Sequence, residues 1–138
     1  MAPQIAAALR FGTVAATLLA VGSCGGSGSD SGDVSCDRDP PLRYDNFGQG
    51  FMGKHCAGCH SSLFEGPMRK GAPPGVDLDT YANVVTWAYR VEARATGDAP
   101  SMPPGGGPSP TELARLDEWL QCSVLRDADA QQAQQGGR

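Results

Sequence analysis

The 138-residue chain has little of what a large core or a polyanion-binding surface requires. Aromatic residues make up only 7% of it, while 19 glycines and 11 prolines favour loops, so the composition predicts one small domain. With 11 Lys+Arg against 15 Asp+Glu, the formal net charge is −4, and no clustered basic stripe is present. A nucleic-acid partner is therefore set aside. No stretch alternates polar and apolar residues as a strand would, which favours an all-α fold.

Histidine is scarce as well, since the chain has only His55 and His60. A structural zinc site takes four ligands, usually from a second cysteine or histidine pair, and the remaining cysteines lie far away in sequence. A thioredoxin-like dithiol follows a strand within a βαβ unit, and no such context is visible. Zinc binding and dithiol chemistry are thus disfavoured alternatives for the motif that follows.

What the chain does contain is Cys56-Ala57-Gly58-Cys59-His60, the C-x-x-C-H pattern of covalent haem attachment. Two thiols at this spacing lie within one helical turn and can reach the two vinyl groups on one haem edge. The adjacent histidine can then take one axial position on the iron. The motif predicts one haem c, bound through Cys56 and Cys59, with His60 as the proximal iron ligand.

The amino-terminal apolar run, residues 11–21, has the length of a signal-peptide core and is too short to span a bilayer as a stable helix. It ends in Val21-Gly22-Ser23-Cys24, which resembles a bacterial lipobox. That resemblance implies a signal peptide over residues 1–23 and a lipid on Cys24, with an ordinary signal peptide and a fortuitous cysteine as the alternative. Gly25 favours sorting to the outer membrane. We expect an exported protein, lipid-anchored on the periplasmic side of a bacterial membrane.

Composition also divides the rest of the chain. Gly- and Ser-rich sequence predicts a flexible tether after the lipidated cysteine, over residues 24–43. The haem domain is expected over residues 44–122. A polar, Gln-rich tail, disordered or with a short helical extension, is expected over residues 123–138.

The five cysteines are not all used by lipid and haem. Once Cys24, Cys56 and Cys59 are assigned, Cys36 and Cys122 remain. An exported protein lives in an oxidising compartment, where an even remainder favours a disulfide. Two free thiols are the alternative.

Three helices are predicted from apolar residues at helical spacing, over residues 45–59, over 79–96 and from Ser109 onward. The third is the clearest, because residues 109–112 form a capping box with Pro110 at the first helical position. Asp79 or Thr80 can cap the second.

Met102 lies among prolines in the loop between the second and third helices. A thioether is a soft ligand, and His/Met coordination raises the reduction potential of a haem iron. Prolines stiffen the backbone that would present the sulfur. The competing methionines are Met1, Met52 and Met68, of which Met52 is interpreted as helix packing. We predict Met102 as the distal iron ligand.

Residues 44–122 resemble a class I cytochrome c domain, with C-x-x-C-H on the first helix, M-P-P in a loop and an aromatic last helix. The family commonly has a glycine eight residues before the first haem cysteine, where this chain has Gly48. It commonly has an aromatic residue four before, where this chain has Met52, with Phe51 one place earlier. The resemblance implies three main helices with long loops wrapped round one covalent haem.

The resemblance also implies a set of contacts. The first and last helices would cross closely, with Gly48 and Phe51 against Trp119 and Leu116, and would bring Cys36 towards Cys122. A backbone carbonyl next to a proline, Pro67 or Pro73, would accept the ring N–H of His60. Candidates for the haem propionates, with loop charges or core aromatics as the alternative, are Arg69, Lys70, Tyr81 and Trp87. His55 is expected to be a surface or packing residue.

The function implied by this resemblance is electron transfer and not enzymatic catalysis. With both axial positions filled, the iron would offer a substrate no open position. We expect a membrane-tethered carrier of single electrons between redox-partner proteins. The alternatives are a peroxidase or dehydrogenase haem domain in which Met102 is displaced, and a haem-based sensor.

Overall fold

The structure is a computed structural model that describes residues 34–137, which contain helices and turns and no strand. The prediction of an all-α fold is confirmed at this level. The predicted signal peptide, Cys24 and the first ten residues of the predicted tether lie outside the described residues. Within residues 34–137, no helix is both long enough and apolar enough to cross a bilayer.

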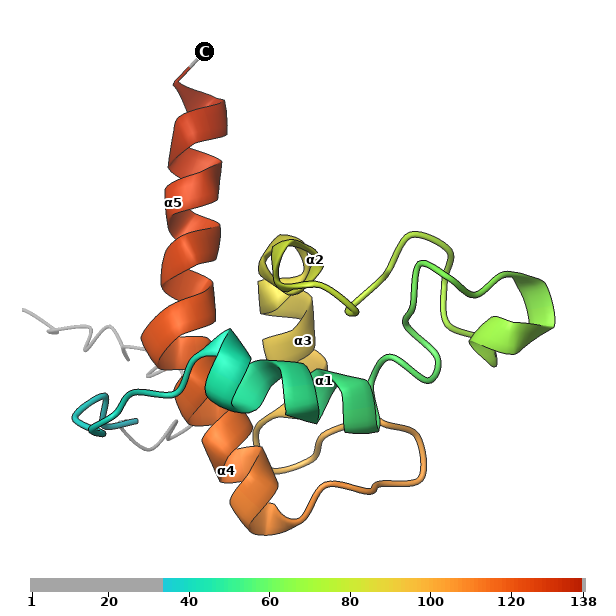
Figure 1. Ribbon diagram of the computed structural model, residues 1–138, viewed down its shortest axis with the longest axis horizontal. Coiled ribbons are helices and arrows are strands. Elements are labelled where there is room, and N and C mark those ends of the chain that lie inside the picture. The colour runs from blue at the N-terminus through green and yellow to red at the C-terminus, as the bar shows by residue number, and fades with distance from the viewer. Residues whose placement is uncertain (1–33, 138) are drawn as a thin grey trace, which may run out of the picture.

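The described residues form five α-helices and three short helical turns, joined by loops (Figure 1). In order, they are a π-helical turn Tyr44–Gly48, α1 Gln49–His55, a 3-10 turn Gly66–Arg69, α2 Tyr81–Thr86, α3 Ala88–Ala95, α4 Pro110–Trp119, a π-helical turn Leu120–Val124 and α5 Leu125–Gly136. The loop that carries the 3-10 turn extends away from α5, to the opposite side of the molecule in Figure 1.

The three predicted helices are present with changed boundaries. The first ends at His55, so the haem motif begins in the turn that follows α1. The second is divided at Trp87 into α2 and α3. Thr80, and not Asp79, caps α2, because its side chain accepts a hydrogen bond from the Asn83 amide. The predicted capping box of the third is confirmed, with reciprocal hydrogen bonds between Ser109 and Glu112.

The carboxyl-terminal segment is helical as far as Gly136, so of the two alternatives expected for it, a disordered tail or a helical extension, the structure has the helix. Leu125 and Ala128 are buried. The hydroxyl groups of two tyrosines on α2 and α3 donate hydrogen bonds to α5, from Tyr81 to Asp127 and from Tyr89 to Asp129. Contacts with α2 and α3 therefore stabilise α5, a helix that its polar composition alone would not stabilise.

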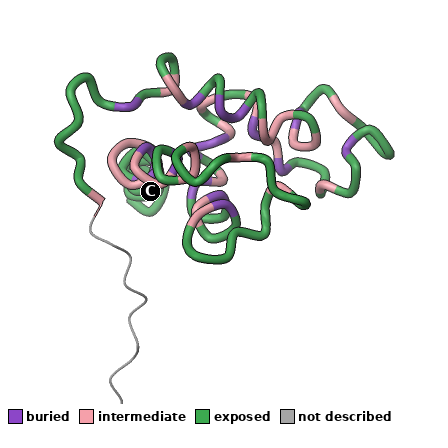
Figure 2. Tube along the Cα trace, turned by 90° about the horizontal axis from the view of Figure 1, so that it is seen from below, coloured by how far each residue is buried: buried purple, intermediate pink, exposed green. Residues whose placement is uncertain are grey.

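One part of the core lies where the turn Tyr44–Gly48, just before α1, crosses the end of α4. A Cβ atom added at Gly48 would lie 2.3 Å from Trp119 Cζ2, a distance that no real contact reaches, so this crossing requires glycine. Trp119 is completely buried, and the Phe47 ring meets it edge-on with ring centroids 5.9 Å apart. The close crossing implied by the resemblance is thus present. Buried residues occur as short stretches between exposed ones, as expected for a small core (Figure 2).

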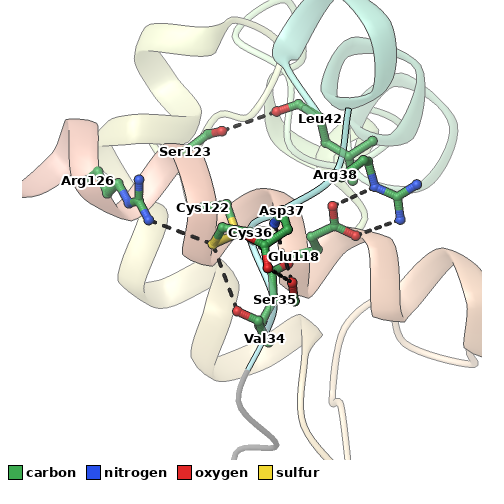
Figure 3. The surroundings of a disulfide bond; sticks show 10 residues. All are labelled: Val34, Ser35, Cys36, Asp37, Arg38, Leu42, Glu118, Cys122, Ser123 and Arg126. Carbon is green, nitrogen blue, oxygen red and sulfur yellow. Dashed lines mark hydrogen bonds and ion pairs between the residues drawn. A yellow bond between two sulfur atoms is a disulfide. The ribbon is translucent and has the colours of Figure 1, made fainter. Parts of the chain in front are cut away.

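Residues 34–43, the described part of the predicted tether, lie against the carboxyl-terminal helices (Figure 3). Cys36 and Cys122 are brought to disulfide-bonding distance, with Cα atoms 5.5 Å apart. Arg38 forms a bidentate ion pair with Glu118, with Nε 2.6 Å from Oε1 and Nη2 2.7 Å from Oε2. The folded domain therefore begins before residue 44, and any free tether ends earlier than the composition predicted.

Candidate functional site

A cavity of about 350 Å³ opens between α1, α3 and the two long loops, within the range usual for ligand pockets. Its wall is mainly apolar and includes Phe51, Val76, Leu78, Val91, Ala95 and Leu113. Cys56, Cys59, His60 and Met102 all line it as well. The residues that the sequence assigned to the haem, from two distant segments, thus share one cavity.

The His60 ring is oriented by a backbone carbonyl. Its Nδ1 lies 2.8 Å from the Val76 carbonyl oxygen. An imidazole that donates from Nδ1 presents the lone pair of Nε2, the atom that a metal would take. The choice of tautomer follows from this partner.

The acceptor differs from the one that the resemblance implied. It is Val76 and not a residue next to Pro67 or Pro73. The Val76 amide donates to the Pro73 carbonyl at 3.2 Å, closing a turn in which Gly75 has φ of +79°. Since only glycine adopts that φ readily, the turn places Val76 under the ring without a proline beside it.

Arg69 organises this loop from within. It is the only buried charged residue among residues 34–137, with 4% of its surface exposed. Its guanidinium donates to the carbonyl oxygens of Ser61 (2.7 Å), Phe64 (3.3 Å), Ala72 (3.2 Å), Pro73 (2.8 Å) and Val76 (3.0 Å), and to Asp77 Oδ1 (2.8 Å). Arginine has five N–H donors, so none is left for a haem propionate, which corrects that expectation for Arg69.

Asp79 fixes the other end of the same loop. Its carboxylate accepts hydrogen bonds from Ser61 Oγ (3.0 Å), Ser62 N (2.9 Å), Ser62 Oγ (2.8 Å) and Asn83 Nδ2 (3.1 Å). Desolvation opposes ionisation, but these hydrogen bonds, those from Ser62 first, outweigh it and lower the pKa of Asp79 to about 2. The residues just after His60 are therefore tied to the start of α2.

The two motif cysteines carry no disulfide and are partly buried. Desolvation, followed by the neighbouring Cys59, raises the pKa of Cys56 to about 12. The Cys56 thiol is therefore protonated at neutral pH, whereas a reactive redox dithiol depends on a thiolate of lowered pKa. This environment disfavours the dithiol alternative.

Met102 reaches the cavity from the opposite loop. The amides of Ser101 and Met102 both donate to the Arg94 carbonyl, at 2.8 and 2.9 Å, and attach the loop to the end of α3. Met102 is 37% exposed. The competing methionines differ, because Met52 is buried in the core, as predicted, and Met68 is 59% exposed and away from the cavity wall. Met1 lies outside the described residues.

The remaining candidates divide in the same way. Lys70 and Trp87 line the cavity, although the Trp87 indole donates to the Gly75 carbonyl at 3.1 Å. Tyr81 is bonded to Asp127, away from the cavity, which corrects that expectation. Two cations that the sequence analysis missed, Arg90 and Arg94, also line the wall. Their positions on a helix gave no signal separable from ordinary surface charge.

His55 is a packing residue, one of the two roles expected for it. Its side chain is 6% exposed, its ring lies 4.8 Å from that of Phe51, and Nε2 lies 3.3 Å from Glu112 Oε1. Glu112 also accepts from Lys54, and these contacts, that of Lys54 first, lower the pKa of the Glu112 carboxyl. The contacts of Lys54 and His55 with Glu112 join the end of α1 to the start of α4 beside the cavity.

The donor set fits a haem better than a lone metal ion. Among residues 34–137, no three His, Cys, Asp or Glu side chains gather as a metal site would need. A porphyrin brings its own equatorial nitrogens and needs from the chain only axial ligands, an apolar enclosure and, in c-type proteins, two cysteines. The cavity offers each of these. Neither protein-family models, nor curated proteins, nor solved structures give a match to this chain.

Proposed function

We propose that this protein is a c-type cytochrome, of the class I kind, that carries single electrons between redox-partner proteins. The observation that carries the proposal is the meeting of Cys56, Cys59, His60 and Met102 on one apolar cavity. Cys56, Cys59 and His60 precede α3 in the sequence, and Met102 follows it. A chance occurrence of the motif would not require these residues to meet at one cavity. The crossing of Gly48 with Trp119 adds independent support, because the resemblance implied it.

In this proposal, each residue has a defined task. Cys56 and Cys59 would hold haem c through thioether bonds, and His60 Nε2 and the Met102 sulfur would be the ligands of its iron. The haem, once bound, supplies the one-electron couple of its iron. Val76 keeps the His60 ring in the donating tautomer, and the apolar wall would limit access of water to the iron. No position remains open for a substrate, so the proposed role is transfer and not catalysis.

The proposed location rests on the amino-terminal sequence. A lipid on Cys24 would hold the domain at the periplasmic side of a bacterial membrane, with Gly25 favouring the outer one. Replacing Cys24 with Ser tests this, because the protein should move from the membrane fraction to the soluble fraction. Unchanged partitioning would contradict lipidation.

A second candidate function has one observation in its favour. Met102 is 37% exposed and sits in a loop without buried residues, so its sulfur is the less secure of the two ligands. If it dissociates, the iron opens to peroxide or to a small ligand, and the protein would act in a peroxidase system or as a haem-based sensor.

The test of the main proposal is extraction of the purified, denatured protein with acidified acetone. A covalent haem stays with the polypeptide, whereas a non-covalent one passes into the solvent. A coloured precipitate with a mass raised by one haem is the expected result. A colourless chain of unmodified mass would overturn the proposal.

A further inference from the structure

The loop on the His60 side contains a charged group that the proposed electron-transfer chemistry leaves without a role. Arg69 is buried among backbone carbonyls, where a cation is stable only if its donors are satisfied. Packing alone would be served by an apolar side chain. The position of its acceptors is therefore informative.

The acceptors belong to two stretches of chain. Ser61 and Phe64 lie just after His60, whereas Pro73, Val76 and Asp77 lie in the second half of the loop, where the chain returns towards α2. One planar guanidinium thus joins the stretch that carries the histidine to the stretch that carries its hydrogen-bond acceptor. The Leu78 amide adds one backbone link, donating to the His60 carbonyl at 2.8 Å.

One acceptor is shared. The Val76 carbonyl oxygen receives both the His60 ring, at 2.8 Å, and Arg69 Nη2, at 3.0 Å. A carbonyl has two lone pairs and can accept both. Arg69 therefore holds the same atom that orients the imidazole.

We propose that Arg69 is a positioning residue for His60, holding the Val76 carbonyl in place so that the imidazole keeps its orientation and its electron-donating strength towards the iron. This inference rests on the proposed haem site. Its role is not one of charge, because Asp77 pairs with Arg69 at 2.8 Å. It is one of geometry, which only a fork of several fixed donors can provide.

Arg69→Lys separates these two contributions. Lysine keeps the positive charge but offers three donors from a single point, so it cannot hold both stretches. The hydrogen bond from His60 to Val76 should then loosen. A ring N–H that is held less firmly makes the imidazole a weaker donor, which favours the reduced iron and raises the reduction potential.

The experiment measures two quantities on the full-length protein as purified. The first is the solvent exchange rate of the His60 Nδ1 proton in the reduced protein, by nitrogen-15 NMR. The second is the reduction potential. Arg69→Lys should speed the exchange by about tenfold and raise the potential. The matched control is Arg38→Lys, an arginine that pairs with Glu118 away from the cavity wall and does not contact Val76, which should change neither. An unchanged exchange rate, or a potential that falls or stays constant, would overturn the inference.

A third measurement covers a variant that does not fold. In the parent protein, the Arg69 guanidinium protons should exchange far more slowly than those of Arg38, whose side chain is 44% exposed. Equal rates would contradict the buried contacts on which the inference depends. If the purified protein holds no haem, the proposed function fails, yet both exchange measurements still decide whether Arg69 holds the loop.

Discussion

Residues 61–80, on the His60 side of the cavity, and residues 96–109, on the Met102 side, are both loops between helices, but their backbones are held differently. We call them the proximal and the distal segment. The proximal segment contains four buried residues, Ser61, Arg69, Val76 and Leu78, and the carbonyls and hydroxyls that Arg69 and Asp79 bind. The distal segment contains no buried residue.

Few hydrogen bonds hold the distal segment. Apart from the helix-end contacts of Thr96 and Ser109, two backbone hydrogen bonds join Ser101 and Met102 to the Arg94 carbonyl, and one closes a turn from Gly106 to Pro103. Glycines 105–107 all have positive φ, so this stretch of backbone adopts conformations that other residues avoid. The protein therefore shapes the proximal side of the cavity by itself, whereas the position of Met102 depends more on what it binds.

The first way to break this comparison is to remove the attachment on the proximal side. Replacing both Cys56 and Cys59 with Ser should abolish covalent haem completely, because no other described cysteine is free. Acid-acetone extraction of the variant should leave a colourless chain. Colour retained by the double variant would place the attachment elsewhere and refute the assignment.

On the distal side, Met102→Ala should leave the covalent haem in place and open the iron. Cyanide, which the parent should bind slowly or not at all, should then bind readily, and the reduction potential should fall because a thioether ligand raises it. Spectrophotometric cyanide titration and a potentiometric titration measure these effects. Met68→Ala is the control, since Met68 is exposed and away from the cavity. Rapid cyanide binding by the parent would favour the peroxidase or sensor function instead.

A change in the scaffold should leave both segments as they are. The bond between Cys36 and Cys122 closes a long loop, with a sequence separation of 86 residues. Replacing both with Ser should lower the free energy of unfolding by about 4–5 kcal/mol in the chain-entropy model. Denaturant unfolding followed by circular dichroism measures this loss. The haem spectrum should not change, and a changed spectrum would show that the scaffold and the cavity are not separable.

The smallest expected effect concerns Asp79, the carboxylate at the end of the proximal segment. Its pKa of about 2 is below the ordinary value of 3.8, so its ionised form stabilises the fold above that ordinary value, and the contribution is lost as the pH falls through about 2. Asp79→Asn should therefore be less stable than the parent at neutral pH, and the difference should shrink in acid. Acid titration followed by circular dichroism measures both curves.

The control for this comparison is Asp98→Asn, an exposed aspartate of the distal segment. It should match the parent at every pH. A gap between parent and Asp79→Asn that stays constant in acid would show that the Asp79 hydrogen bonds do not depend on its charge.

Sequence reasoning succeeded where a short pattern carries the information. The C-x-x-C-H motif and the proline-flanked methionine line one cavity, as a shared site requires. Gly48 lies against Trp119, as the family resemblance implied. Each depends on a residue type with a distinctive property: a thiol, a thioether or the absence of a Cβ. Helix existence followed from apolar periodicity, and the capping box fixed the start of α4.

The rest lay in contacts that no side-chain pattern marks. Arg69 binds mostly backbone carbonyls, which every residue has, so its acceptors could not be identified from the sequence. The Val76 carbonyl is chosen by the turn at Gly75, not by a proline. The helix α5 has few apolar residues, and its order comes from tertiary contacts such as that between Tyr81 and Asp127.

The most direct test is the far-red absorption of the oxidised protein, where a weak band arises only when a methionine sulfur is bound to ferric haem. It requires the haem, its attachment and the distal ligand together. The parent and Met68→Ala should both show the band, and Met102→Ala should lack it while keeping its haem. A parent protein that holds haem but shows no band, or a Met102→Ala variant that retains it, would contradict the proposed His60/Met102 site.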